Sequence, residues 1–129
     1  MAHTNEDLLR RGYEAFTKGD IQTLGELFAD DIVWHVGGRS QLAGDYRGKE
    51  EVFGLFAKFA ELTGGTLRIE LHDALANDEH AIALQKATGE REGRTLDDNG
   101  VGVYHTSGGK VSEAWFHPGD GYAVDEFWG

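Results

Sequence analysis

The N-terminal third of the chain carries apolar residues at the spacing of two short helices. Residues 5–18 form the first predicted helix, and residues 20–29 the second, since apolar side chains recur there every three or four positions. Gly19 allows the first helix to end in a left-handed conformation, and the side chain of Asp20 can cap the second. Asp30 and Asp31 are expected to end this helix before a strand over residues 32–36. The first helix presents on one face Leu9, Gly12, Tyr13 and Phe16.

A third amphipathic helix is predicted over residues 49–62, between flanking glycines. The polar, glycine-rich stretch that precedes it, residues 37–48, is too long for a tight turn. Connections of this length often form the rim or lid of a pocket, so we expect the same here. The apolar face of the helix is made of Val52, Phe53, Phe56, Phe59 and Ala60.

The second half of the chain alternates between apolar and polar residues, which is typical of β-strands. Tight turns are predicted at residues 77–79 and 107–109, and a charged loop around residues 89–94. Helices followed by a strand meander favour an α+β fold in which the helices cover one side of an antiparallel sheet. The aromatic tail, residues 122–128, is expected to pack on another surface. The predicted strands cover residues 66–76, 80–88, 96–106 and 111–117.

Length and charge indicate the number of domains and exclude some classes of binding partner. The 129 residues suit a single domain, residues 1–129, and the formal charge of −11 argues against nucleic acid or an anionic membrane as a partner. The chain has no cysteine, no apolar run long enough to span a membrane and no recognisable signal sequence. A cytoplasmic location is therefore the default expectation.

The order of the predicted elements and four sequence stretches resemble a known family. These stretches are GD before a short helix ending in LFADD, HDALANDEHAIAL, the turn GGK before the last strand, and the tail YAVDEFW. Together they resemble the SnoaL-like polyketide cyclases, which belong to the nuclear transport factor 2-like and ketosteroid isomerase-like superfamily. The resemblance implies a cone-shaped, curved antiparallel sheet wrapped around three N-terminal helices (a cystatin-like α+β roll), with a pocket in its concave face. Because members of this superfamily differ widely in activity, the fold alone does not identify a reaction.

The resemblance also implies which side chains point into the cone. Ile32, Trp34 and Val36 would face inward on the first strand, and Ala83, Gln85 and Ala87 on the second meander strand. Ala114 and Phe116 would face inward on the last strand. On the third meander strand the implied inward residues are Asp97, Asn99, Val101 and Val103.

Two established activities of the superfamily lack their acids in this chain. Ketosteroid isomerases need two acidic groups, one as base and one as hydrogen-bond donor. The matching positions are Val36 and Val101, so ketosteroid isomerase activity itself is not expected. SnoaL-type cyclases carry a histidine and an aspartate beside the tryptophan of the last strand, where this chain has Ala114 and Phe116 around Trp115.

The remaining polar candidates are few. Tyr13 matches the helix-one tyrosine of the isomerases and would polarise a ligand oxygen, with Asn99, Gln85 or His117 assisting. His117 lies near Asp120, and a histidine held by an aspartate is a plausible proton acceptor near neutral pH. The alternative interpretation of His117, a surface histidine at a strand end, is the more common case for such a position. The candidate ligand-binding residues are Trp34, Val36, Phe53, Phe56, Gln85, Val101 and Phe116.

No metal site or cofactor is expected, because the histidines are scattered without the converging spacing that metal ligands need. Tyr104 and Trp115 are expected on the outer face of the sheet, where such domains commonly dimerise. Burying these rings against a second copy would remove apolar surface from water, so we expect a homodimer.

Two interpretations remain open at this stage. One is an isomerase, cyclase or hydrolase that uses acid–base chemistry on a small hydrophobic oxygenated molecule. The other is a non-catalytic dimeric domain that binds a small molecule or acts as a scaffold.

Overall fold

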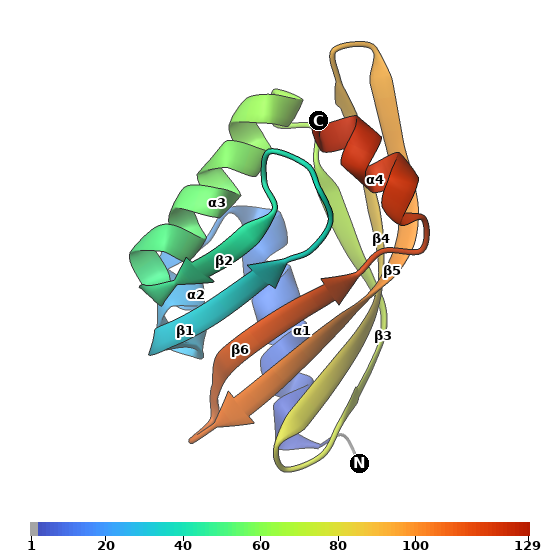
Figure 1. Ribbon diagram of the computed structural model, residues 1–129. Helices are drawn as coiled ribbons and strands as arrows, with labels where there is room; N and C mark the ends of the chain where they lie inside the picture. Colours follow the sequence, from blue (N-terminus) through green and yellow to red (C-terminus); the bar gives the residue numbers. More distant parts are fainter. Residues whose placement is uncertain (1–2) are drawn as a thin grey trace.

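Three helices pack into the concave side of a curved six-stranded sheet, and a fourth helix follows the last strand (Figure 1). The computed structural model describes residues 3–129. The predicted α+β class, with helices first and the sheet after them, is confirmed. The helices are α1 (Thr4–Lys18), α2 (Ile21–Leu27), α3 (Gly48–Thr63) and α4 (Gly121–Trp128). The strands are β1 (Phe28–Val36), β2 (Gly44–Arg47), β3 (Arg68–Ala76), β4 (His80–Arg91), β5 (Arg94–Ser107) and β6 (Lys110–His117).

The junction between α1 and α2 forms as predicted. Gly19 adopts a left-handed conformation with φ of 68°, which ends α1. The carboxylate of Asp20 accepts a hydrogen bond from the backbone N–H of Thr23 at 3.1 Å, which caps α2. Strand β1 then begins directly at Phe28, four residues earlier than predicted, so Asp30 and Asp31 belong to the strand.

The strand order in the sheet is β2-β1-β6-β5-β4-β3. All neighbours are antiparallel except β1 and β6, which run parallel, so the expectation of a fully antiparallel sheet is wrong for this pair. The two strands lie far apart in sequence, and the intervening chain lets them enter the sheet in the same direction. The predicted loop 37–48 is also only partly a loop, because β2 pairs back onto β1 with Trp34 opposite Tyr46.

The β4–β5 hairpin sets the register of the concave face. Residues 89–94 are not a charged loop: Arg91 pairs with Arg94 across a two-residue turn, in which Glu92 and Gly93 have φ of 50° and 79°. Positive φ at both positions is typical of a tight type I′ turn. This turn places Gly100 opposite Gln85, so the even-numbered residues of β5 share the inner face with Gln85.

The inward set predicted for β5 is consequently displaced by one residue. Asn99 is exposed, and Val103 pairs with Trp115 on the other face. The prediction was wrong because the period of a strand is two, so that misplacing a turn by one residue exchanges its faces.

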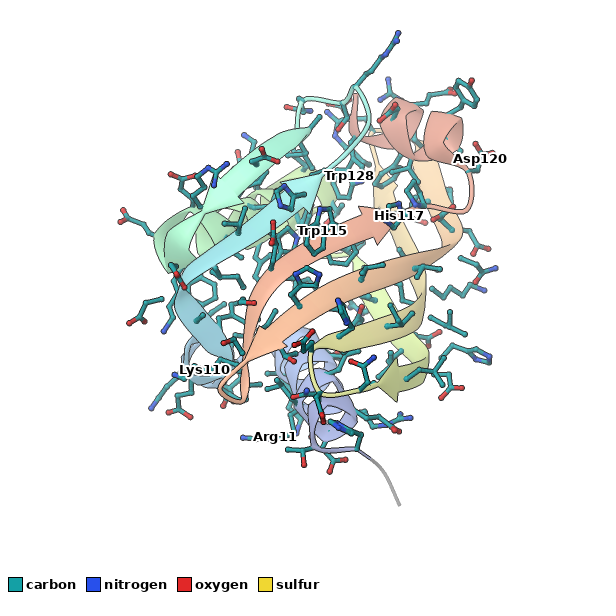
Figure 2. The ribbon with its side chains drawn as sticks, turned by 60° about the horizontal axis from the view of Figure 1, so that its bottom comes forward. Arg11, Lys110, Trp115, His117, Asp120 and Trp128 are labelled. Carbon is teal, nitrogen blue, oxygen red and sulfur yellow. The ribbon has the colours of Figure 1, made fainter. Side chains whose placement is uncertain are left out.

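Tyr104 also lies on the opposite face from the one expected. It is 4% exposed and pairs with Ala114, whose side chain is fully enclosed in the core. Trp115 does lie on the outer face, as does His117, and both stand on β6 in Figure 2. The expected interface pair of Tyr104 and Trp115 is therefore separated by the thickness of the sheet.

The aromatic tail folds as α4 and packs on the chain itself. The Asp120 carboxylate caps α4 by accepting a hydrogen bond from the N–H of Ala123 at 3.1 Å. Phe127 and Trp128 are buried. The guanidinium of Arg91, itself buried, donates to the Phe127 carbonyl at 3.2 Å and so satisfies one of the free acceptors at the end of the helix. None of the described helices has the length and apolar character needed to cross a membrane.

Candidate functional site

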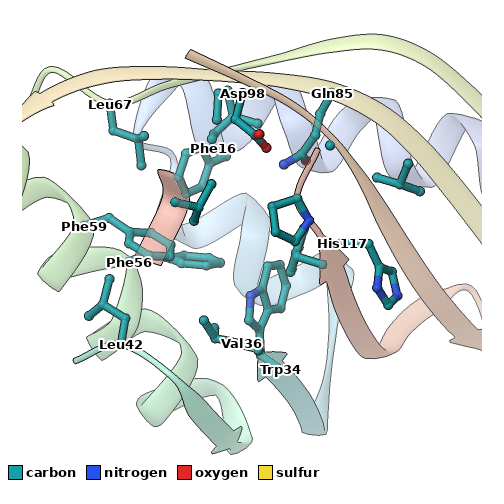
Figure 3. Close-up of a pocket in the computed structure, with 18 of the residues that line it drawn as sticks. Phe16, Trp34, Val36, Leu42, Phe56, Phe59, Leu67, Gln85, Asp98 and His117 are labelled. Carbon is teal, nitrogen blue, oxygen red and sulfur yellow. The ribbon is translucent and has the colours of Figure 1, made fainter. Parts of the chain in front are cut away.

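A cavity of about 440 Å³ lies between the concave face of the sheet and the helices. Its rings come from α1, α3 and the central strands, so residues far apart in sequence meet around one space (Figure 3). Such a volume and largely apolar lining are typical of small-molecule sites. The aromatic part of the wall consists of Tyr13, Phe16, Phe28, Trp34, Phe56, Phe59, Tyr104, Phe116 and Trp128.

Tyr13, Tyr104 and Gln85 form a hydrogen-bonded chain in the wall. The Tyr13 hydroxyl donates to Oε1 of Gln85. The hydroxyl oxygens of Tyr13 and Tyr104 lie 2.8 Å apart, and because the Tyr13 proton is used on Gln85, Tyr104 is the donor to Tyr13. The backbone of β5 leaves room for this arrangement at Gly102, where a Cβ atom would lie 2.9 Å from the Tyr104 ring and 3.1 Å from Phe116.

Both tyrosines are kept protonated by their surroundings. Burial raises the pKa of Tyr13 far above its usual value, although its hydrogen bond with Tyr104 opposes the rise. Burial likewise raises the pKa of Tyr104, and the neighbouring Tyr13 adds to the effect. Near neutral pH these hydroxyls therefore act as hydrogen-bond donors and orient Gln85, and they are poor proton acceptors.

Asp98 is a carboxylate in the cavity wall that the sequence interpretation missed. It lies on β5 opposite Ala87 and accepts hydrogen bonds from the backbone N–H groups of Gly119 and Asp120 at 3.1 and 2.9 Å. Its carboxylate points toward the amide nitrogen of Gln85 in Figure 3, without a hydrogen bond between them. The sequence signal that predicts the inward position of Asp98 is the two-residue turn at Glu92 and Gly93, because this turn sets the pairing of β5 with β4.

Most of the predicted site residues gather around this cavity. Asn99 does not, because it lies on the outer side of β5. Phe53 does not either: it lies on α3 about one turn before Phe56 and packs against the rings of Phe56 and Phe28. His117 borders the cavity from the end of β6, but its side chain is exposed. The predicted residues that line the cavity are Tyr13, Trp34, Val36, Phe56, Gln85 and Phe116. Val101 and His117 also border it, but they pair with each other on the outer face of the sheet, so the inward orientation predicted for Val101 is wrong.

Helix α4 and the loop between β1 and β2 complete the wall. The Asp125 carboxylate accepts the backbone N–H of Arg39 at 3.0 Å, and the amide of Gln41 donates to the carbonyl of Trp128 at 2.8 Å. Gly38 permits the close approach of Asp125, since a Cβ there would lie 2.2 Å from a carboxylate oxygen. These contacts tie the C-terminal helix to the loop.

A second polar cluster lies on the outer face of the sheet. His35 lies between Asp45 and Glu113, with each ring nitrogen 2.6 Å from a carboxylate oxygen, and its ring stacks on Trp115 at 5.1 Å. Burial alone would lower the pKa of His35, but the hydrogen bonds to Glu113 and Asp45 outweigh it and raise this pKa. Across residues 3–129 no three histidine, aspartate or glutamate side chains converge in a way that would hold a metal ion.

Known proteins resemble this chain over nearly its whole length. A protein of Mycobacterium tuberculosis described only as uncharacterized is 32% identical over 123 residues, covering 95% of this chain and 94% of that protein. The structure of Bal32a, from a soil-derived mobile gene cassette, is 40% identical and superposes with a TM-score of 0.95, covering 98% and 97% of the two chains.

Two further structures extend the likeness of the fold. A protein of unknown function with a cystatin-like fold, from Xanthomonas campestris, is 29% identical with a TM-score of 0.91 and covers 99% of both chains. A protein of Jannaschia sp. CCS1 that is regarded as a SnoaL-like polyketide cyclase is 15% identical, with a TM-score of 0.78 over 97% of this chain and 91% of that one. At this low identity the likeness shows the fold alone.

The sequence pattern of the SnoaL-like domain matches residues 9–114, which include most of α1, all of α3 and most of the sheet around the cavity. With this match over most of the chain, the protein belongs to the SnoaL-like family and has its nuclear transport factor 2-like fold.

Proposed function

We propose that this protein binds a small, largely apolar, oxygenated molecule in the cavity between the helices and the sheet. The observation that carries the proposal is the cavity of about 440 Å³, whose aromatic wall is interrupted by a few converging polar groups. Rings supply apolar contact, and hydroxyl, amide and carboxylate groups supply orientation. The polyketide-cyclase assignment of the distant Jannaschia protein is compatible with an oxygenated carbon skeleton as ligand.

Native mass spectrometry of freshly purified protein tests this proposal. We expect a mass excess that disappears on denaturation and corresponds to a small organic molecule. The decisive variant is Gly12→Leu, because Gly12 lines the cavity on α1 and a Cβ there meets nothing within 4 Å. A leucine side chain would occupy the ligand's space and abolish the mass excess.

Gly54→Leu is the matched control. Gly54 is an exposed helical glycine on α3 with equally open surroundings, and it does not line the cavity. This variant should keep the bound molecule. If Gly12→Leu folds and still carries the same molecule at full occupancy, the ligand binds elsewhere and the proposal is wrong.

Proton-transfer chemistry on the bound molecule is the second candidate function. Asp98 favours it, because its carboxylate lies in an otherwise largely apolar wall and is held in place by two backbone N–H groups. A fixed carboxylate can accept a proton from a carbon acid, while the amide of Gln85 stabilises negative charge that develops on a ligand oxygen. In this proposal Asp98 takes the role of base that the sequence had suggested for His117.

The compound 5-nitrobenzisoxazole tests for such a base, since removal of its carbon-bound proton opens the ring and gives a coloured phenolate. We expect catalysis to fall by at least about tenfold in Asp98→Asn. Asp97→Asn is the control, because the neighbouring carboxylate is exposed and lies 3.5 Å from Lys86 on the outer face. Equal rates in wild type and Asp98→Asn would contradict the role of Asp98 as a base, without affecting the proposed binding function.

We also propose that the protein forms a homodimer through the outer face of the sheet. This face presents Trp115 and Val103 next to each other, and Leu75 nearby is 56% exposed. A second copy would remove these apolar groups from water. Analytical ultracentrifugation should give the mass of a dimer for wild type and of a monomer for Val103→Glu; a monomeric wild type would contradict the proposal.

A further inference from the structure

The cavity wall holds hydrogen-bond donors that the protein itself does not use. Trp34 is 8% exposed, and its indole N–H has no acceptor among the described residues. Among the described residues, every side-chain nitrogen or oxygen that is fully enclosed by protein has a hydrogen-bond partner. Because the Trp34 nitrogen has none, it is not fully enclosed and borders open space. In Figure 3 it faces the space between Phe56 and Val36, inside the cavity.

Gln85 supplies another free donor. Its carbonyl oxygen accepts the hydrogen bond from Tyr13, which fixes the orientation of the amide. The amide nitrogen has no acceptor among residues 3–129 and lies on the cavity side of β4 (Figure 3). Two fixed N–H donors therefore face a largely apolar space, and a ligand oxygen that accepts hydrogen bonds would satisfy them.

The charges around the cavity restrict that ligand further. Among the described lining residues there is no lysine or arginine, whereas Asp98 and Asp125 are both carboxylates. A carboxylate ligand would enter without a lysine or arginine as counter-ion and would be repelled by these groups. Burying an unpaired charge in such surroundings is far more costly than burying a neutral carbonyl that receives hydrogen bonds.

We infer that the cavity selects an uncharged ligand with a carbonyl oxygen on a flat apolar body, and that Trp34 and Gln85 are its specificity determinants. We infer a flat body because aromatic rings form one side of the wall: the ring centroids of Trp34 and Phe116 lie 5.1 Å apart, with 32° between the ring planes. This inference rests on the proposed binding function and adds the class of ligand: ketones, aldehydes or esters, and not the corresponding free acids.

Three naphthalene derivatives of similar size test the inference: 2-acetylnaphthalene, 2-naphthoate and 2-ethylnaphthalene. Their dissociation constants are measured by calorimetry near neutral pH. We expect 2-acetylnaphthalene to bind at least about tenfold more tightly than either of the others, which corresponds to the gain of one or two hydrogen bonds. A preference for 2-naphthoate would overturn the inference while leaving the binding function intact. If none of the three binds, the proposed binding function fails and the inference falls with it.

Trp34→Phe and Trp115→Phe form a matched pair of variants. Both remove an indole N–H, but Trp115 stands on the outer face and should change none of the three constants. Trp34→Phe should weaken both ligands, because the phenyl ring offers less apolar contact than the indole, but it should weaken 2-acetylnaphthalene several-fold more, since only the ketone also loses a hydrogen bond. Measurable binding of 2-ethylnaphthalene shows that the cavity of this variant is intact. Undiminished preference in Trp34→Phe overturns the role of the indole.

Gln85→Glu provides a second test should Trp34→Phe fail to fold. A glutamate keeps the acceptor for Tyr13 and replaces the free amide donor by a negative charge. Binding of 2-acetylnaphthalene should weaken by about tenfold or more relative to 2-ethylnaphthalene. If the ratio of the two dissociation constants stays as in wild type, Gln85 does not contact the carbonyl and the inference is wrong.

Discussion

The hydroxyl of Tyr104 donates a hydrogen bond to the hydroxyl of Tyr13 over 2.8 Å, linking the third strand of the meander to the first helix. The Tyr13 hydroxyl in turn donates a hydrogen bond to Gln85, so three polar residues from α1, β4 and β5 are hydrogen-bonded to one another inside an aromatic wall. The direction of these hydrogen bonds has a measurable consequence, because Tyr104 needs Tyr13 as an acceptor whereas Tyr13 keeps its own acceptor, Gln85, when Tyr104 is changed.

Removing the Tyr13 hydroxyl should destabilise the protein more than removing that of Tyr104. Tyr13→Phe leaves the buried Tyr104 hydroxyl without an acceptor, which costs about 2 kcal/mol, whereas Tyr104→Phe loses one hydrogen bond and strands no donor, at about 1 kcal/mol. Urea denaturation of the two variants measures the difference. The reverse order would mean that the donor direction runs the other way.

The outer-face histidine should make stability depend on pH. The pKa of His35 is raised in the folded state, so the charged form adds stability that is fully present below the unfolded value of about 6.5 and is lost as pH rises through the folded value. His35→Gln should therefore cost up to about 1 kcal/mol more at about pH 6 than at about pH 9. Denaturation curves at both pH values give this difference. The exposed His72, changed to Gln, is the control and should show much less pH dependence.

Alanine at Gly12 or Gly54 should stabilise the protein. Both glycines lie inside helices without positive φ, and an added Cβ meets nothing within 4 Å in either case. Each substitution reduces the freedom of the unfolded chain and should raise the free energy of unfolding by about 0.5–1 kcal/mol. Thermal and urea denaturation check the result. A loss of stability in Gly12→Ala alone would show that α1 packs more tightly over the cavity than its surroundings indicate.

Loss of Arg91 should loosen the C-terminal helix. Arg91 is 9% exposed and donates to the Phe127 carbonyl, so Arg91→Met would leave this buried acceptor unpaired at a cost of about 1–2 kcal/mol. The exposed Arg94 donates to the Glu126 carbonyl, and Arg94→Met should cost less than about 1 kcal/mol because water replaces the donor. Hydrogen exchange of the α4 amides should increase in the first variant and change little in the second. Unchanged exchange in Arg91→Met would show that α4 is held by its aromatic side chains alone.

The sequence by itself determined the elements whose signals are local. Helix α1 ends at Gly19 and α2 is capped by Asp20 because a left-handed glycine and a short acceptor side chain act within a few residues of their partners. Alternation on β4 and β6 placed Gln85 and Phe116 on the inner face, because each of these strands keeps a single pattern along its length. The family likewise followed from stretches that are continuous in the chain.

Only the tertiary structure decided which polar groups share the cavity. Asp98, and not Asn99, faces inward because a two-residue turn sets the pairing of β5 with β4, and a shift of one residue exchanges the faces of a strand. The parallel pairing of β1 with β6 and the closure of the wall by α4 join segments far apart in sequence, so no local pattern predicts them. The free donors of Trp34 and Gln85 become visible only once every other hydrogen-bonding partner has been assigned in space, since an unused donor is defined by what surrounds it.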